Sequence, residues 1–219
     1  MGIQEDIKPR MRWWGWGVDG HDKPIKPGAT EILKSVCGME DVHTPPVKLE
    51  DVKVNPSKLD ADDIAALKAI VGDEFFKDDH YTRVMHTYGR SYPDLLRLRL
   101  GKCEGAPDAI VYPGSEDDIA KLFEVCSERG IAVIPFGGGT SVAGGVEAMR
   151  GKFKKAISIS MLRFNKIVEI DTKAMTVTVQ PGVFGPDLEA ELGKWGVTVG
   201  HFPQSFEFST VCLLYTPPS

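Results

Sequence analysis

Residues 131–141, I-A-V-I-P-F-G-G-G-T-S, decide the fold that we expect for this chain. The apolar run Ile131–Pro135 predicts a buried strand, and a glycine loop follows it at once. Upstream, the run Asp108–Tyr112 predicts a second short strand. Between the two strands, Ser115 is a typical helix N-cap and Gly130 is a typical helix end. Because a strand–helix–strand unit builds parallel pairing, we expect a parallel sheet next to the loop.

The segment after the loop has the patterns of further strands and of one helix. Three runs rich in β-formers occupy residues 156–160, 166–170 and 176–180. Residues 175–180 alternate between apolar and polar side chains, as a half-buried strand should. The segment Pro186–Trp195 predicts a helix with Leu188 and Leu192 facing inward.

The chain before residue 105 is less regular. Residues 1–60 are rich in Pro, Gly and Lys and have little sustained periodicity. Asp60–Val71 predicts a helix, because either Asp60 or Asp62 could cap it and apolar positions follow at helical spacing. Pro93–Leu100 leaves two alternatives open, since Pro in a first turn favours a helix whereas the Leu/Arg alternation fits a strand. The fold class predicted for the whole chain is α+β.

Composition and charge narrow the class of protein. The chain is 42% hydrophobic and 26% charged, which is typical of a globular protein that buries a core. A net charge of −5 and the lack of a long basic run argue against nucleic acid as a partner. The acidic start, Met1–Asp6, is not a secretory signal, and four scattered cysteines fit a reducing compartment. We therefore expect a cytosolic or organellar protein that is not secreted.

The glycine loop has the chemistry of an anion site. Five glycines occur within residues 137–145 and follow the predicted strand directly. Consecutive N–H groups in such a turn form a concave nest for an anion, and Thr140 and Ser141 add hydroxyl donors. Glycine also lets a ligand approach the backbone closely, so we expect Gly138→Val to abolish ligand retention by filling the nest and straining φ. A phosphate or pyrophosphate is the expected guest.

Two common phosphate motifs are absent from this loop. The dinucleotide fingerprint G-x-G-x-x-G, started at Gly137, would need glycine where Val142 stands. A P-loop would need lysine after Gly144, but Gly145 and Val146 follow. From the residues alone, a tight glycine turn without a ligand stays an open alternative.

Three segments resemble the PCMH-type FAD-binding domain of the vanillyl-alcohol oxidase superfamily. They are P-D-A-I-V-Y-P-G-S-E-D-D-I (107–119), I-P-F-G-G-G-T-S (134–141) and V-Q-P-G-V (179–183). The resemblance implies that the loop holds the FAD pyrophosphate through Pro135, Phe136, Gly137, Gly138, Gly139, Thr140 and Ser141. Some relatives attach the flavin through a histidine in or near this loop. Because residues 135–141 contain no histidine, the resemblance implies non-covalent FAD.

Three further segments are similar to the alkyldihydroxyacetonephosphate synthase family. They are R-W-W-G-W-G (12–17), R-V-M-H-T-Y-G-R-S (83–91) and G-H-F-P-Q-S-F-E-F-S-T-V (200–211). The last implies a second FAD contact through Pro203, Gln204, Ser205, Phe206, Glu207, Phe208 and Ser209. The implied activity is exchange of the acyl chain of acyl-dihydroxyacetone phosphate for a fatty alcohol, which forms an ether lipid. The flavin would act there as a covalent trap with no net redox change.

The resemblance also implies how the chain is divided. The expected parts are an N-terminal extension (1–104), an incomplete FAD-binding domain (105–211) and a non-matching tail (212–219). The family's catalytic residues would lie beyond the matched segment, so none is assigned and this chain alone is expected to be inactive. His80, His86 and His201 are too dispersed to suggest a metal site, so none is expected. The expected location is cytoplasmic in a bacterium or peroxisomal in a eukaryote.

Several alternatives stay open at this stage. The runner-up function is an FAD-dependent oxidoreductase of 2-hydroxy acids such as lactate or glycolate, and a non-catalytic flavin-binding fragment is a third. A homodimer and a peripheral contact with a membrane are hypotheses about partners. The tryptophans Trp13, Trp14 and Trp16 are expected to pack onto a neighbouring domain, rather than to form a stacking platform or a membrane anchor. Glu207 is either a base or an acceptor of backbone hydrogen bonds.

Overall fold

A computed structural model describes residues 10–21, 25–26, 28–40 and 44–212. The predicted tail lies outside these residues except for Cys212. The helices and strands, in chain order, are α1 (Ala29–Cys37), α2 (Ala61–Val71), β1 (Phe76–Lys77), α3 (His80–Met85), α4 (Tyr92–Arg99), β2 (Ala109–Val111), α5 (Glu116–Arg129), β3 (Ile131–Phe136), β4 (Lys155–Ser160), β5 (Ile167–Asp171), β6 (Thr176–Val179) and α6 (Gly185–Gly193). Three short 3-10 helices cover Leu49–Asp51, Asp73–Phe75 and Met161–Arg163. The predicted α+β class is confirmed.

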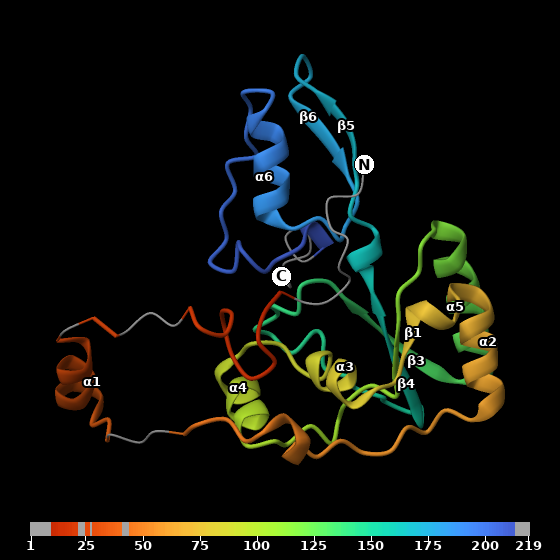
Figure 1. Cartoon of the computed structure of the whole chain (residues 1–219), viewed down its shortest axis with the longest axis horizontal. Coiled ribbons are helices and arrows are strands. Elements are labelled where there is room, and N and C mark those ends of the chain that lie inside the picture. The colour runs from red at the N-terminus through yellow and green to blue at the C-terminus, as the bar shows by residue number, and fades with distance from the viewer. Residues whose placement is uncertain (1–9, 22–24, 27, 41–43, 213–219) are drawn as a thin grey trace.

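The main sheet has four strands in the order β1-β2-β4-β3. Both β2 and β3 run parallel to β4, and β1 is antiparallel to β2. The predicted strand–helix–strand unit is therefore parallel, but β4 is inserted between its two strands. The strands β5 and β6 form a separate antiparallel pair (Figure 1).

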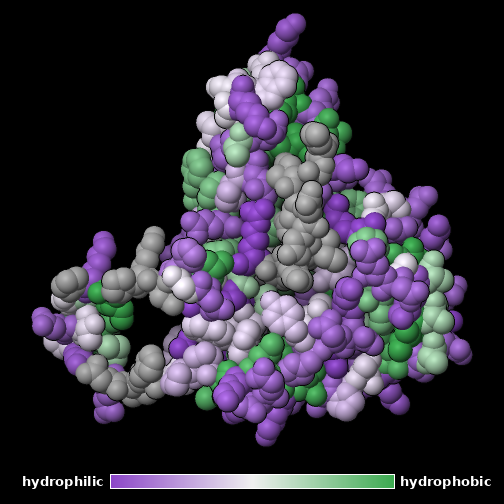
Figure 2. Space-filling view, in the orientation of Figure 1, coloured by the Kyte–Doolittle hydropathy of each residue, from purple (hydrophilic) through white to green (hydrophobic). Residues whose placement is uncertain are grey.

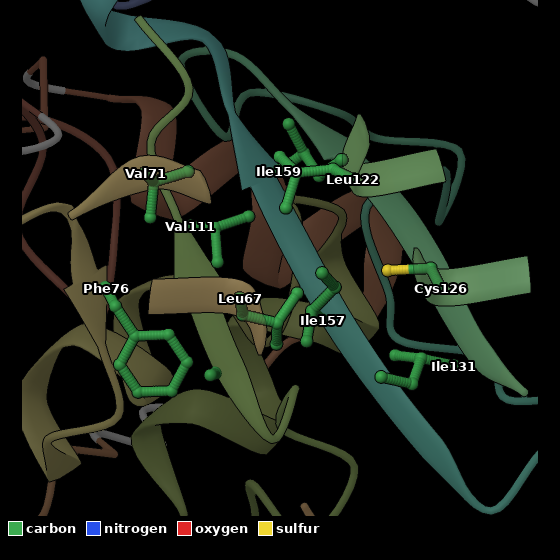
Figure 3. Packing of buried hydrophobic residues seen from close by; sticks show 10 residues of the cluster. Leu67, Val71, Phe76, Val111, Leu122, Cys126, Ile131, Ile157 and Ile159 are labelled. Carbon is green, nitrogen blue, oxygen red and sulfur yellow. The ribbon is translucent and has the colours of Figure 1, made fainter. Parts of the chain in front are cut away.

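Helices α2 and α5 lie side by side against the main sheet (Figure 1). Their apolar side chains meet those of the strands in one cluster, shown in Figure 3, that includes Leu67, Val71, Leu122, Cys126, Val111, Ile157 and Ile159. Because α2 and β1 precede residue 105 in the chain, this core joins both sides of the predicted boundary at residue 104. Burying each large apolar side chain contributes roughly 1.5–3 kcal/mol.

Local capping explains where the two covering helices begin and end. Asp60 caps α2 and Ser115 caps α5, and each forms a capping box with the residue three positions on. Gly130 ends α5 in the left-handed region, at a φ of 64°. Ser115 and Gly130 are the caps expected from the sequence, and of the two candidates Asp60 and Asp62 the structure uses Asp60.

The structure resolves the open question at Pro93–Leu100 in favour of a helix. Ser91 caps α4 by accepting the N–H of Asp94, and Pro93 lies in the first turn. Leu98 is fully buried, whereas Leu96 and Leu100 are exposed. The Leu/Arg alternation is therefore compatible with one buried helical face.

Helix α1 stands apart from the rest of the chain (Figure 1) and buries none of its residues. Its apolar side chains Ile32 and Val36 are 62% and 77% exposed, and Figure 2 shows apolar surface there. Within the part of the chain that the structure describes, no helix is both long and apolar enough to cross a membrane.

Candidate functional site

The glycine loop leaves the end of β3 and folds over a buried aromatic ring. Gly139 has a φ of +73°, and a Cβ there would lie 2.7 Å from Cζ of Phe136. The Phe136 ring packs in turn against the buried His86 ring, with 4.1 Å between their centroids. Burial lowers the pKa of His86 to about 4, so the ring is neutral near pH 7. Phe136 is therefore a support beneath the loop.

The predicted second segment is in direct contact with the loop. A Cβ on Gly138 would lie 1.8 Å from the carbonyl oxygen of Phe208, and one on Gly137 would lie 2.4 Å from Oγ1 of Thr210. Neither glycine has a positive φ. The reason predicted for Gly138 is therefore wrong in part: a side chain would not strain φ but would collide with the chain's own backbone.

A chain of hydroxyl groups ties the two segments together. Thr140 Oγ1 lies 2.9 Å from Ser209 Oγ, which lies 2.5 Å from Ser205 Oγ. Thr140 and Ser209 are buried, so these bonds are shielded from water. Ser141 Oγ accepts the N–H of Gly145 at 3.2 Å, which leaves its own proton free to be donated.

Three backbone N–H groups of the glycine loop have no hydrogen-bond acceptor among the described residues. Among the described residues, the N–H groups of Gly138, Gly139 and Thr140 donate to no protein acceptor. Buried backbone donors are normally paired, so this cluster is suited to an anion with several oxygens. A pyrophosphate fits that requirement.

A cavity of about 710 Å³ adjoins Thr140, the last of these three donors. Its lining comprises Trp16, Thr140, Val142, Gln204, Ser205, Phe206, Glu207 and Phe208. The volume lies within the range of roughly 300–1,000 Å³ that is usual for cofactor sites. One wall is supplied by the loop, one by the second segment and one by the N-terminal tryptophan motif.

The structure brings together the two predicted segments but uses their residues differently. Thr140 and Gln204–Phe208 line the cavity. The other predicted residues do not line it: Pro135, Phe136, Gly137, Gly138, Gly139, Ser141, Pro203 and Ser209. Phe136 and Ser209 are instead buried within the protein. Their predicted contact with the cofactor stays a prediction.

Sequence reasoning missed two residues of the lining. Val142 directly follows the predicted loop, so its position in the chain was the available signal. Trp16 belongs to a motif for which packing onto a neighbouring domain was favoured over a stacking platform or a membrane anchor.

The structure also shows the surroundings of Glu207, one of the polar residues that line the cavity. The Glu207 side chain is exposed, and among the described residues it accepts no hydrogen bond, so the backbone-acceptor alternative is not supported. Within the same residues, no group of three or more His, Cys, Asp or Glu side chains could hold a metal ion.

Known proteins match this chain along most of its length. The FAD binding domain family matches residues 107–212. An alkyldihydroxyacetonephosphate synthase from Dictyostelium discoideum is 39% identical over 94% of this chain. The chain belongs to the alkyldihydroxyacetonephosphate synthase family. It is thus similar to a family of enzymes, and FAD is the cofactor of the matched domain.

A solved structure supports the family assignment. An alkyldihydroxyacetonephosphate synthase structure superposes with a TM-score of 0.79 at 33% identity, over 92% of this chain. The chain spans 38% of the length of the Dictyostelium relative and 42% of that solved chain. The glycolate oxidase subunit GlcD of Bacillus subtilis is less similar, at 28% identity over 65% of this chain and 27% of its own length.

Proposed function

We propose that this chain forms a non-covalent FAD site in which the glycine loop binds the pyrophosphate and the second segment contacts the flavin. The observation that carries the proposal is the cluster of N–H groups at Gly138, Gly139 and Thr140 that donate to no acceptor among the described residues, of which Thr140 lines the cavity. The direct contact of Gly138 with Phe208 holds both parts of the site at one place.

The histidines support a non-covalent site. His86 is fully buried against Phe136, so it is not available for a bond to the flavin. His201 is exposed and lines a different cavity, which shares Phe206 with the first.

The proposed activity is the exchange of the acyl chain of acyl-dihydroxyacetone phosphate for a fatty alcohol. Similarity to the synthases over 92–94% of the chain supports it. When bound, FAD would supply the reactive centre of that exchange without a net change of redox state. The residues described here would bind and orient the cofactor and exclude water from one side of it. Since no catalytic residue is assigned, we expect this chain to bind FAD without performing the exchange by itself.

Titration with FAD tests the binding step. We expect flavin absorbance to stay with the protein on gel filtration and to be released entirely by denaturation. Free flavin after gel filtration would contradict the proposal, and flavin retained after denaturation would contradict its non-covalent part.

A second candidate is oxidation of a 2-hydroxy acid, which the likeness to the glycolate oxidase subunit favours. The two functions are distinguished by assaying a full-length protein that contains this chain. Bleaching of its bound flavin by lactate or glycolate would support this oxidoreductase, whereas release of fatty acid from acyl-dihydroxyacetone phosphate on addition of a fatty alcohol would support the synthase.

The proposal also covers the cellular location of the protein, its oligomeric state and its contact with membranes. We propose a cytoplasmic location in a bacterial host or a peroxisomal one in a eukaryotic host, a homodimer, and a peripheral contact with membranes through which lipid substrates arrive. Fractionation of cells, sedimentation and co-sedimentation with lipid vesicles test these points separately.

A further inference from the structure

The three tryptophans of the R-W-W-G-W-G motif have different surroundings. Trp13 packs against the apolar cluster that contains Leu98. The Trp14 ring lies under two guanidinium groups, 4.4 Å from that of Arg12 and 4.9 Å from that of Arg99. Trp16 is 37% exposed and lines the candidate cofactor cavity. The motif was expected to pack onto a neighbouring domain, but Trp13 and Trp14 pack on residues of the predicted N-terminal extension itself, and Trp16 lines the cavity.

A closed turn holds Trp16 in place. The backbone N–H of Arg12 donates to the carbonyl of Gly17 at 2.9 Å, and its guanidinium donates to the carbonyl of Val18 at 2.8 Å. Gly17 has a φ of +81°, and a Cβ there would lie 3.1 Å from Nη2 of Arg12. The indole is thus presented by a turn that is hydrogen-bonded at both ends.

The same turn is fastened to the glycine loop through one buried residue. The Arg90 guanidinium donates to the carbonyl of Arg12 at 3.2 Å, and the Arg90 backbone N–H donates to the carbonyl of Ser141 at 2.6 Å. Gly89 permits this approach, because a Cβ there would lie 2.0 Å from the Ser141 oxygen. The distance between Trp16 and the loop is therefore set by residues 89–90.

The cavity between them suits a planar ring. Phe206, Phe208 and Val142 make much of its wall apolar. Gln204 and Glu207 add polar groups that can bind the edge of a heteroaromatic ring. An indole face offers a large apolar area and favours offset stacking on another aromatic ring.

We infer that Trp16 is a cofactor-binding residue that stacks on a ring of the FAD whose pyrophosphate lies on the glycine loop. This inference rests on the proposed function. The N-terminal turn is then part of the cofactor site rather than only a packing element. The shared chemistry is a planar heteroaromatic ring, either the isoalloxazine or the adenine.

The test compares FAD affinity and flavin emission among variants of the full chain. Trp16→Ala removes the ring and should weaken FAD binding about tenfold, the order expected for losing one stacked aromatic. Trp16→Phe keeps a smaller ring and should weaken it less than threefold. Trp195→Ala is the matched control, because Trp195 is 58% exposed and does not line this cavity, and should bind like the wild type.

The readouts separate the two rings. A rise in the emission of bound flavin in Trp16→Ala would assign the stack to isoalloxazine, since the indole quenches it. Unchanged emission with weaker FAD binding and weaker competition by ADP would assign it to adenine. Equal affinity and emission in Trp16→Ala and the wild type would overturn the inference and leave the proposed function standing. Failure of the wild type to bind FAD would overturn both.

Discussion

The two β-layers of this protein differ in how they are covered. In β2 every residue is buried, and in β4 all but the first, so both faces of these strands are packed. In β5 and β6 exposed residues recur along the strands; Val168 of β5 is 63% exposed, and Met175, in the turn between the strands, is 68% exposed. Figure 2 shows apolar surface around this hairpin. The centre of the main sheet, β2 and β4, is packed on both faces, whereas the hairpin is packed on one side.

The candidate site joins these unequal parts. The glycine loop extends from β3 of the main sheet, and the second segment follows α6, which packs on the hairpin. The contact between Gly138 and Phe208 and the Thr140–Ser209 bond therefore link a part that is packed on both faces to a thinner part that is packed on one. A ligand bound across both should stabilise the thinner part more.

The largest expected effect comes from breaking this link at Gly138. Gly138→Val should abolish measurable FAD binding and lower the free energy of unfolding by about 3 kcal/mol, because its Cβ collides with the Phe208 carbonyl. FAD titration and urea unfolding measure the two effects. Gly145→Ala is the matched control, since its Cβ would meet only Ser141 Oγ at an ordinary 3.6 Å. If both variants behave alike, the two segments do not pack as described.

The next largest expected effect is a loss of stability at acid pH, which arises from His86, packed against Phe136 at the end of β3. The pKa of buried His86 is lowered to about 4 from 6.5. Between these pH values the unfolded chain binds a proton that the folded chain does not, so the free energy of unfolding falls as the pH falls through this window. The loss is about 3 kcal/mol by pH 4.

Urea unfolding at several pH values checks the His86 prediction. His86→Gln should start less stable at pH 7 and show a smaller loss between pH 6.5 and pH 4. Parallel pH profiles for the variant and the wild type would contradict it.

Hydrogen exchange compares the two layers directly. We expect amides of β6 to exchange at least about tenfold faster than those of β4, a difference of about 1.4 kcal/mol in opening free energy, because a one-sided layer opens locally. Adding FAD should slow exchange in the hairpin more than in the sheet. Equal protection of β4 and β6 would show that the two layers open as one unit.

The smallest effect concerns the hydroxyl link. Thr140→Val keeps the shape of the side chain and removes the bond to Ser209, which should cost about 1 kcal/mol. A double-mutant cycle with Ser209→Ala measures the coupling between the two residues. A coupling energy of zero would mean that the link adds no stability.

Much of the fold could be predicted because its signals are local. The caps Asp60, Ser115 and Gly130 act within one helical turn, and the alternation at residues 175–180 is a property of a single strand. At Pro93–Leu100 local signals conflicted, and burial of Leu98 against distant residues decided for the helix. The residues of the glycine loop likewise predicted a phosphate site. The prediction that the ligand is FAD came from the family resemblance.

Short-range chemistry therefore determines most of the element types, and it predicts the anion nest at residues 137–141. Only the tertiary structure determines that β4 separates β2 from β3, that Phe208 fills the space beside Gly138, and that Trp16 lines the cavity. The partners in these contacts lie far apart in the chain. A local sequence pattern cannot predict which distant backbone segment will occupy the space that a glycine leaves open. That contact depends on how all the buried surfaces pack together.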